Sequence, residues 1–459
     1  MFKFHSHRNI VMTEGSLWKS TLLFAIPLLL SGLLQLLFNA ADTIVVGRFS
    51  GQEALAAVGS VGSLNSLMVN LFLGLSTGTN VVVARFIGAR DRKNAHDAVH
   101  TAVSVSVIGG LALAVIGFVL ARPILQWMGS PDDVIDLAVL YVRIIFIGMP
   151  VQMLYNFSAA VLRSVGDTKR PLYFLAISGV INVVLNVIFV VAFHMSVAGV
   201  ALATILSQVV SAWLVVRSLM LREDEVHLDI RSLRINGKIL MEITRIGLPS
   251  GVQSSMFSIA NILIQSSVNS FGTVAMAANA AAGNICSFVH QGVQATAQTV
   301  TAFAGQNMGA RKPRRILHVM WVCQAWNLVF TGIMGVGSYV FGNQLLSLYT
   351  TSPEVIRLGM ERMLVVNVPY LLMGVCDIFS GALRGIGYSM LPMIITICGI
   401  CLLRMAWLAT FFKLYPTMTG LMLTYPVSWI VTSIVMGAFF FVLFKRMQKS
   451  FSTSELLAE

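Results

Sequence analysis

Charged side chains are scarce in this sequence. Of its 459 residues only 11% are charged, whereas 56% are hydrophobic, and the mean hydropathy is +0.81. An ordinary soluble protein carries about 25% charged residues. The composition therefore excludes an ordinary soluble protein of this length and predicts a chain that lies in a lipid bilayer.

Cysteines and catalytic motifs are also scarce. The five cysteines lie in apolar segments and have neither disulfide nor metal-ligand spacing, so we interpret them as small core hydrophobes (Cys286, Cys323, Cys376, Cys398 and Cys401). The sequence contains no HExxH, P-loop, GxSxG or dinucleotide-binding motif. We therefore expect no enzyme and no cofactor. Without an ATP site, uphill transport would have to draw its energy from an ion gradient.

The net charge of +12 does not indicate a nucleic-acid partner. Lysine and arginine stand in short clusters between apolar runs and do not form one concentrated basic face. Residues 1–20 are polar and basic, and the apolar run that follows is too long for a signal-peptide core and lacks an A-x-A-like cleavage site. We expect this first apolar run to remain as a membrane anchor and span.

Long apolar runs dominate the rest of the chain. About 20 apolar residues cross a hydrocarbon core, and by this measure the sequence predicts twelve membrane-spanning helices. They are expected near residues 18–46, 54–82, 98–121, 134–158, 171–193, 197–220, 239–268, 274–304, 316–340, 355–380, 391–412 and 419–444. The predicted fold class is an all-α integral membrane protein.

The basic clusters predict the orientation, because lysine and arginine are retained on the cytoplasmic side. With the N-terminus inside, the inner connections contain most of the 31 basic residues, and the outer side carries the acidic stretch 130–136. We predict a multi-pass protein of the inner or plasma membrane with both termini in the cytoplasm. Its expected parts are a cytoplasmic segment (1–17), an N-terminal lobe (18–220), a cytoplasmic linker (221–238), a C-terminal lobe (239–446) and a cytoplasmic tail (447–459).

The chain resembles itself at an offset of 221 residues. The matching pairs are Gly88-Ala89-Arg90 with Gly309-Ala310-Arg311, "GQEALAA" (51–57) with "GTVAMAA" (272–278), "LRSVGDTKRP" (162–171) with "LRGIGYSMLP" (383–392), and "AGVAL" (198–202) with "TGLML" (419–423). Each half then has six spans in the same orientation, which predicts a parallel tandem repeat with a pseudo-twofold axis along the membrane normal. Such folds bind substrate between their halves, so transport is the leading class of function; a duplicated structural protein is the alternative.

Asp42 is a carboxylate near the outer end of the first predicted span, and its position indicates a functional role. A charge at the centre of a spanning helix costs roughly 2.5–3.5 kcal/mol on insertion scales. Asn182 and Asn186 lie one turn apart in the fifth span and Thr204 lies in the sixth, whereas Asp42 itself falls on Leu263 in the second half. Carboxylate, amide and hydroxyl oxygens suit Na⁺ or a hydrogen-bonded protonated carboxyl. The sequence therefore predicts a cation site within the first half; the alternatives are interfacial water at Asp42 and interhelical hydrogen bonds of the amides.

Other polar residues in the spans are candidates for lining a cavity or a substrate path. They are Asn156, Gln253, Gln291, Gln294 and Asp377, with Gln298 continuing the row on the eighth span. No acidic residue occurs between Glu242 and Glu354, and Asp377 falls on Asn156 of the first half. Arg404 lies in a predicted span and either snorkels to the interface or pairs with a carboxylate. Glycine pairs with GxxxG spacing, such as Gly74 and Gly78, predict close helix packing.

These residues together resemble a known family. The first span with Pro27, Asp42 and Gly47, the "INVVLN" of the fifth span, the "AGVALAT" at the sixth and the "LRGIG" after the tenth resemble the bacterial multidrug and toxic compound extrusion (MATE) transporters. The resemblance extends over roughly residues 15–445. It implies two six-helix lobes that form a V-shaped structure with a central cavity.

The resemblance also implies a function. It implies an antiporter that exports organic cations and amphipathic drugs in exchange for Na⁺ or H⁺ by alternating access. In the family, the residues that match Asp42, Asn182, Asn186 and Thr204 form the cation site of the first lobe, although some members have an aspartate where this chain has Asn186. We expect membrane lipid and small amphipathic substrates as partners, no nucleic acid, and a monomer.

Two other functions remain open at this point. One is a flippase for lipid-linked envelope precursors, which the wider superfamily contains. A pyrophosphate-carrying lipid would require several arginines that face the cavity, and the predicted spans contain few. The other is a passive channel or a scaffold that transports nothing.

Overall fold

The computed structural model describes residues 10–128 and 134–456. These residues form helices and no strand. The predicted N-terminal segment, the predicted outer connection 130–136 and the predicted tail each lie partly outside the described residues. A helix satisfies nearly all its backbone hydrogen bonds within its own segment, which explains why apolar runs in a bilayer adopt it.

The chain divides into two compact units. The first contains Leu30–Ile87 and Asp91–Gly247, and the second contains Ile10–Leu29, Gly88–Arg90 and Leu248–Glu459. The first helix, α1 (Leu17–Phe49), contributes its first part to the second unit and the remainder to the first unit. The division after Gly247 falls within helix α9 (Gly237–Asn269), a short distance beyond the predicted linker.

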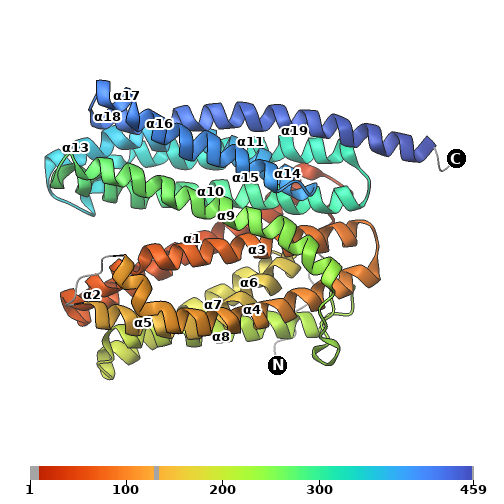
Figure 1. The fold of residues 1–459 in the computed structure, drawn as a ribbon, viewed down its shortest axis with the longest axis horizontal. Coiled ribbons are helices and arrows are strands. Elements are labelled where there is room, and N and C mark those ends of the chain that lie inside the picture. Colours follow the sequence, from red (N-terminus) through yellow and green to blue (C-terminus); the bar gives the residue numbers. More distant parts are fainter. Residues whose placement is uncertain (1–9, 129–133, 457–459) are drawn as a thin grey trace. The chain divides into compact units, whose positions relative to one another are not determined.

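The helices of the first unit correspond to the predicted spans. After α1 they are α2 (Gly51–Ser60), α3 (Gly62–Gly88), α4 (Arg92–Trp127), α5 (Ile135–Ile147), α6 (Met149–Ser164), α7 (Lys169–Asn186), the π-helix η1 (Val187–Ala192) and α8 (Ser196–Met220), followed by the 3₁₀ turn η2 (Ile230–Ser232). Helix α4 packs against α5 and α6, and α7 packs along α8 (Figure 1).

Two of these spans are interrupted where the sequence analysis drew continuous helices. The second predicted span, 54–82, is divided at Val61 into α2 and α3, and α3 continues to Gly88. The fourth consists of α5 and α6, bent by 46° beside Gly148. Pro150 follows that bend, and its missing N–H favours a helix start over a helix interior.

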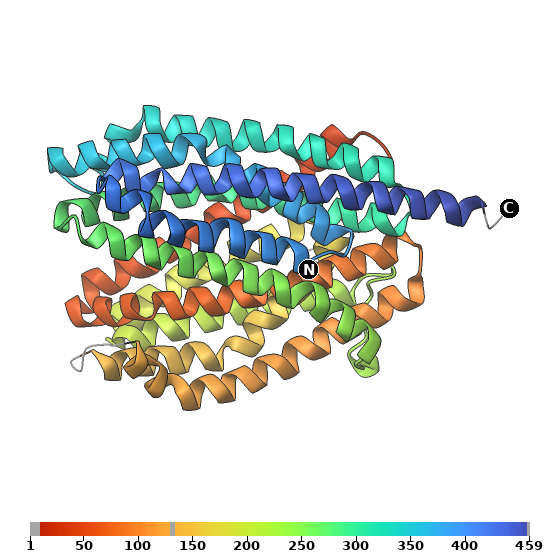
Figure 2. The same ribbon diagram turned by 45° about the horizontal axis from the view of Figure 1, so that its top comes forward.

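The second unit repeats this plan with more breaks. Its helices are α9 (Gly237–Asn269), α10 (Thr273–Gly309), α11 (Pro313–Val340), α12 (Gly342–Ser347), α13 (Pro353–Arg362), η3 (Met363–Asn367), η4 (Val368–Tyr370), α14 (Leu371–Gly385), α15 (Met390–Thr396), η5 (Ile397–Leu402), α16 (Leu403–Ala409), α17 (Phe411–Leu414), α18 (Met418–Met422) and α19 (Thr424–Leu456). Helix α10 packs against α11 and α14, and α14 packs against α19 (Figure 2). Helix α19 continues through most of the predicted tail at 447–459.

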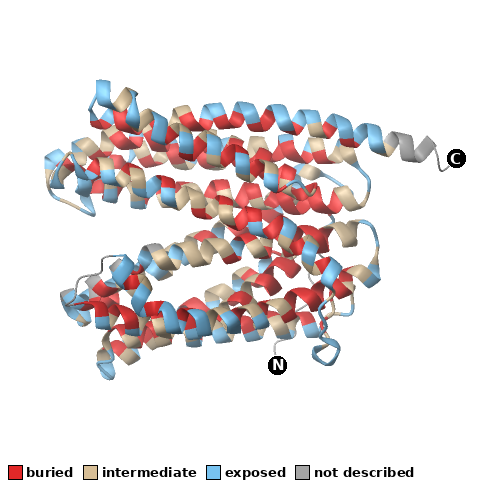
Figure 3. Ribbon diagram, in the orientation of Figure 1, coloured by how far each residue is buried: buried red, intermediate tan, exposed pale blue. Residues whose placement is uncertain are grey.

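The outer faces of the helices carry apolar side chains. Along α19, Ile430, Ile434 and Val442 are exposed, and pale blue follows the outer side of this helix (Figure 3). By length and composition, nine helices among the described residues could cross a membrane, or ten if α5 and α6 form one span. Exposed apolar faces on helices of this kind are expected for side chains that contact lipid.

The internal repeat is visible in the backbone. Three pairs of residues with left-handed φ angles are separated by the predicted offset, one member in each half. The pairs are Gly51 (85°) and Gly272 (88°), Arg90 (58°) and Arg311 (52°), and Gly166 (88°) and Gly387 (101°). Non-glycine residues rarely adopt positive φ, so the two arginines at matching turns confirm the repeat strongly.

A glycine pair brings α3 and α9 into close contact, as its spacing predicts. A Cβ atom on Gly78 would lie 2.2 Å from the carbonyl oxygen of Ile243 and 2.8 Å from the amide nitrogen of Gly247. Any side chain at position 78 would therefore collide with backbone and push the two helices apart.

The linker between the halves is folded against α4. His100, which is fully buried, accepts a hydrogen bond at Nε2 from the backbone N–H of Asp229 (3.1 Å). Arg234 forms an ion pair with the buried carboxylate of Asp97. Both contacts belong to the first unit, so the linker is an ordered part of that unit.

Candidate cation site and cavity of the first unit

The side chains predicted to form a cation site are joined by hydrogen bonds in the structure. Asn186 Nδ2 donates to a carboxylate oxygen of Asp42 and also lies 3.3 Å from Asn182 Oδ1. Asn182 Nδ2 in turn lies 3.5 Å from Thr204 Oγ1. Three helices, α1, α7 and α8, thus place a carboxylate, two amides and a hydroxyl in one continuous series of hydrogen bonds.

Asn186 has an acceptor without a partner. Its side chain is fully buried, and its Oδ1 atom makes no hydrogen bond to any described residue. A buried polar atom without a partner is costly and calls for an explanation such as an absent ion or water. The oxygen lies on the same side chain that donates to Asp42, so a cation at this place would satisfy it.

The backbone changes its winding directly after Asn186. Helix α7 ends there and the π-helical turn η1 begins at Val187. π-helical turns are rare and often occur at functional sites. The sequence analysis did not predict this turn, because apolar periodicity does not distinguish it from an ordinary helix.

A glycine lets α7 approach α1 at this site. A Cβ atom on Gly179 would lie 1.8 Å from Cε2 of Phe38, one turn before Asp42 on α1. Gly179 itself lies one turn before Asn182 on α7. The missing side chain therefore permits the contact that brings Asp42 within hydrogen-bond distance of Asn186.

The site opens into a polar cavity of about 250 Å³ within the first unit. Asp42, Asn156, Asn182 and Thr204 line this cavity, whereas Asn186 lies behind them. No lysine or arginine lines it, and no basic side chain forms an ion pair with Asp42 among the described residues. The Asp42 carboxylate thus accepts a hydrogen bond from Asn186 but has no ion-pair partner in the part of the chain that the structure describes.

Several lining residues were missed by the sequence analysis although a signal was present. Polar residues recur at helical spacing on four of the helices that line the cavity. They are Gln35 and Asn39 with Asp42 on α1, Gln152 with Asn156 on α6, Ser178 with Asn182 on α7, and Ser207, Gln208 and Ser211 with Thr204 on α8. Spacings of three and four residues place side chains on one helix face, so polar stripes within apolar spans would have indicated this cavity.

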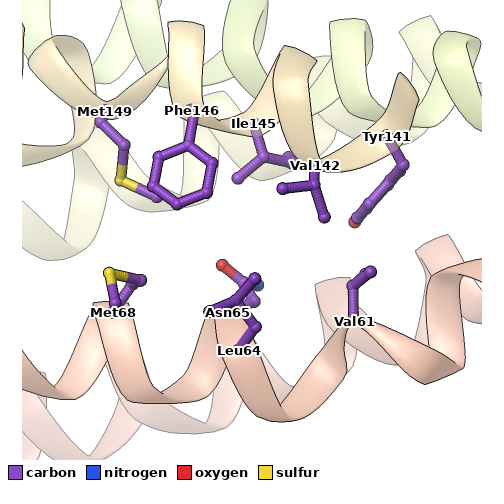
Figure 4. A pocket seen from close by; sticks show the side chains of 9 residues that line it. All are labelled: Val61, Leu64, Asn65, Met68, Tyr141, Val142, Ile145, Phe146 and Met149. Atoms are coloured by element: carbon purple, nitrogen blue, oxygen red, sulfur yellow. The ribbon is translucent and has the colours of Figure 1, made fainter. Parts of the chain in front are cut away.

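A small apolar pocket of about 10 Å³ adjoins the polar cavity and shares Asn65, Tyr141 and Ile145 with it. Figure 4 shows its two walls: the side chains of Leu64, Asn65 and Met68 on α3 point toward those of α5 and α6. Met68 and Met149 face each other at one end (Figure 4). Methionine adapts its shape readily, so this seam provides a pliable apolar wall beside the polar cavity.

Comparison with known proteins identifies the family. The MatE family model matches residues 27–188 and again residues 249–410, once in each half of the repeat. The chain belongs to the MatE family. The family consists of membrane transporters, which confirms the expectation that the protein is not an enzyme.

Relatives and solved structures agree with this assignment. The probable multidrug resistance protein YoeA of Bacillus subtilis is 30% identical over 84% of this chain and 85% of its own length. A protein of Shewanella oneidensis named as an FAD transporter is 25% identical over 89% of this chain and 90% of its own. A crystal structure of a MATE transporter in complex with MaL6 has a TM-score of 0.90 at 24% identity, covering 97% of this chain and 100% of that one, and so shares the fold.

The predicted polar residues of the second half lie in the second unit of this MatE protein and do not line the polar cavity. Gln253, which is buried, donates to Ser380 Oγ (3.2 Å) and Thr396 Oγ1 (3.0 Å). Gln294 Nε2 lies 3.1 Å from His290 Nε2. Gln291 and Gln298 are partly buried on α10, and Asp377 is buried on α14. Their roles in substrate binding remain predictions.

Proposed function

We propose that this MatE protein is a secondary antiporter that exports organic cations and amphipathic drugs in exchange for Na⁺ or H⁺. The coupling ion would bind at Asp42, Asn182, Asn186 and Thr204, and transport would proceed by alternating access between the two halves. The observation that carries the proposal is the Asp42 carboxylate, which lines a cavity without basic residues and adjoins an unpaired buried oxygen. Relatives named as multidrug resistance proteins support the substrate class.

The flippase alternative fits this cavity poorly. A lipid-linked pyrophosphate needs positively charged partners, and arginine is the usual side chain for this purpose. The polar groups that line the cavity are instead amides, hydroxyls, phenols and one carboxylate, and the remaining lining residues are apolar. Such a lining favours a ligand with a positive charge and hydrogen-bond donors.

The test is efflux of a fluorescent organic cation from proteoliposomes under a Na⁺ gradient and, separately, under a pH gradient. We expect one gradient to drive transport by the wild-type protein. Asp42→Asn should abolish gradient-driven transport, because the amide cannot exchange a charge with the coupling ion. Full gradient-driven transport by the Asp42→Asn protein would contradict the assigned role of Asp42.

A matched variant controls for the loss of a carboxylate as such. Asp136→Asn removes an exposed carboxylate of the first unit that forms an ion pair with Arg122. This variant should transport as the wild type does. Absence of transport by every folded variant, the wild type included, would shift weight to lipid-linked substrates.

A further inference from the structure

A buried positive charge lies in the second unit. Arg404 on α16 is 3% exposed, and no carboxylate among the described residues lies within 4.0 Å of its guanidinium group. Its Nε donates to Ser428 Oγ (3.2 Å), and its Nη1 donates to Asn261 Oδ1 (3.2 Å). An arginine within a membrane-spanning segment usually pairs with an acidic group or reaches the interface, and Arg404 does neither.

Aromatic rings complete the surroundings of this guanidinium. Its Cζ atom lies 4.2 Å from the centroid of the Tyr425 ring, within the range of a cation–π interaction. Trp429 packs edge-on against Tyr425 and against Tyr370. The Arg404 guanidinium is therefore held by neutral oxygens and by the face of one aromatic ring, as a bound cation would be.

The residues around Arg404 correspond to residues of the Asp42 cavity. At the matched stretches 198–202 and 419–423 the offset is 221. Directly after these stretches Tyr425 therefore corresponds to Thr204, and Ser428 to Ser207. The family match begins at Pro27 in the first half and at Pro249 in the second, and both prolines lie inside the first helix of their half. Aligning these prolines gives an offset of 222, which pairs Asn261 with Asn39. All three first-half counterparts line the polar cavity.

The charges at the two corresponding places are opposite. Arg404 falls on Val183, directly beside Asn182, whereas Asp42 has an apolar counterpart in the second half, Leu263 or Ile264 depending on the local offset. The first half therefore has a carboxylate where a mobile cation would bind, and the second half has a covalently attached cation at the corresponding place.

We propose that Arg404 is a built-in cation that permanently occupies, in the second half, the place which a mobile coupling ion takes in the first half. Each transport cycle then binds the coupling ion only at the Asp42 site. This proposal rests on the proposed function for the role of Asp42, but the occupancy of the Arg404 site is testable without transport.

The test is chemical rescue of Arg404→Ala in detergent. The truncation removes the atoms of an ethylguanidinium ion, so millimolar ethylguanidinium should raise the thermal midpoint of this variant by several degrees. Ethylurea has nearly the same shape without the charge and should raise it much less. Neither compound should change the midpoint of the wild type. Equal effects of the two compounds, or no effect of either on folded protein, would overturn the proposal.

A second measurement uses variants that keep the side-chain volume and covers the case that Arg404→Ala does not fold. Arg404→Lys should keep the wild-type thermal midpoint within a few degrees, whereas Arg404→Gln, which keeps hydrogen-bonding capacity without charge, should be less stable than Arg404→Lys. A glutamine variant as stable as the lysine variant would show that the charge is not needed and would overturn the proposal.

Counting bound ions tests the consequence of the proposal. Folded Asp42→Asn protein should bind neither ²²Na⁺ nor an exchangeable coupling proton in detergent, because on this proposal Arg404 already occupies the corresponding place in the second half. Retained stoichiometric binding would overturn the proposal. Failure of transport with successful rescue by ethylguanidinium would instead count against the proposed function alone.

Discussion

At the scale of single residues, we predict that Asn186 affects the binding of the coupling ion more than the binding of substrate. It donates to Asp42 and holds the unpaired oxygen, yet it does not line the cavity. Asn186→Leu removes a hydrogen bond to a charged group, an interaction worth about 1.5–3 kcal/mol. We expect the coupling-ion concentration for half-maximal transport to rise about 10-fold to 100-fold, measured in proteoliposomes at fixed substrate.

Asn156→Leu is the matched control for this prediction. Asn156 lines the same cavity but lies outside the hydrogen-bonded chain of Asp42. Its replacement should change the substrate concentration for half-maximal transport and leave the ion dependence nearly unchanged. An equal effect of both variants on the ion dependence would contradict this prediction.

The sequence analysis predicted the four residues that are joined by hydrogen bonds at the candidate cation site, but it did not predict most of the residues that line the cavity around them. Asp42, Asn182, Asn186 and Thr204 attract notice because polar groups are costly within a span. Gln35 and Asn39 lie on the same face of α1 as Asp42. This pattern becomes visible in the sequence only when the spacing between all polar residues of a span is compared with the helical repeat. The unpaired Asn186 oxygen depends on side-chain orientation and could not be predicted from sequence.

At the scale of helices, the contact between α1 and α7 depends on Gly179. Gly179→Ala places a methyl group 1.8 Å from Phe38, and overpacking of this kind typically costs about 1–3 kcal/mol. We expect a lower thermal midpoint in detergent and weaker coupled transport, because the shift separates Asn186 from Asp42. In a Phe38→Ala background the same substitution should cost less, and an unchanged cost in that background would contradict the assigned contact.

The contact between the linker and α4 depends on Arg234. Arg234 is exposed but pairs with the buried Asp97 carboxylate. Arg234→Ala leaves that carboxylate without its charged partner, so residues 221–236 should detach from α4 more often. Limited proteolysis of the purified protein should therefore cleave the linker faster. Arg231→Ala, at an exposed arginine of the same linker, should leave the rate unchanged; equal acceleration would show that only the loss of charge matters.

Helix breaks were the part of the fold that the sequence predicted least well. The bend beside Gly148 and the division at Val61 occur where glycine or proline is present, but spans tolerate both residues in unbroken helices as well. Whether a helix breaks there depends on what packs against it. The presence of helices was predicted better: each of the twelve predicted spans contains helical segments in the structure, because long apolar runs favour helices.

At the scale of the whole molecule, the repeat was predicted from four short matches and is confirmed by the paired left-handed turns and the double family match. The four matches did not reveal that the offset is 222 in the first helix of each half, so that the first half has one extra residue between Pro27 and Gly51. That shift pairs Asn39 with Asn261, a correspondence that a single offset conceals. An insertion of one residue is easily overlooked in the sequence, and comparing the buried contacts of corresponding residues in the two halves helps to reveal it.

Membrane orientation is the remaining prediction for the whole molecule. The excess of lysine and arginine in the inner connections places the linker in the cytoplasm and the turn around α17 outside. Leu233 and Leu414 are exposed leucines at these two places, so single cysteines there leave every charge unchanged. In a variant without the five natural cysteines, an impermeant thiol reagent should label Leu414→Cys in intact cells and Leu233→Cys only after permeabilisation. The reverse pattern would place both termini outside and would contradict the predicted orientation.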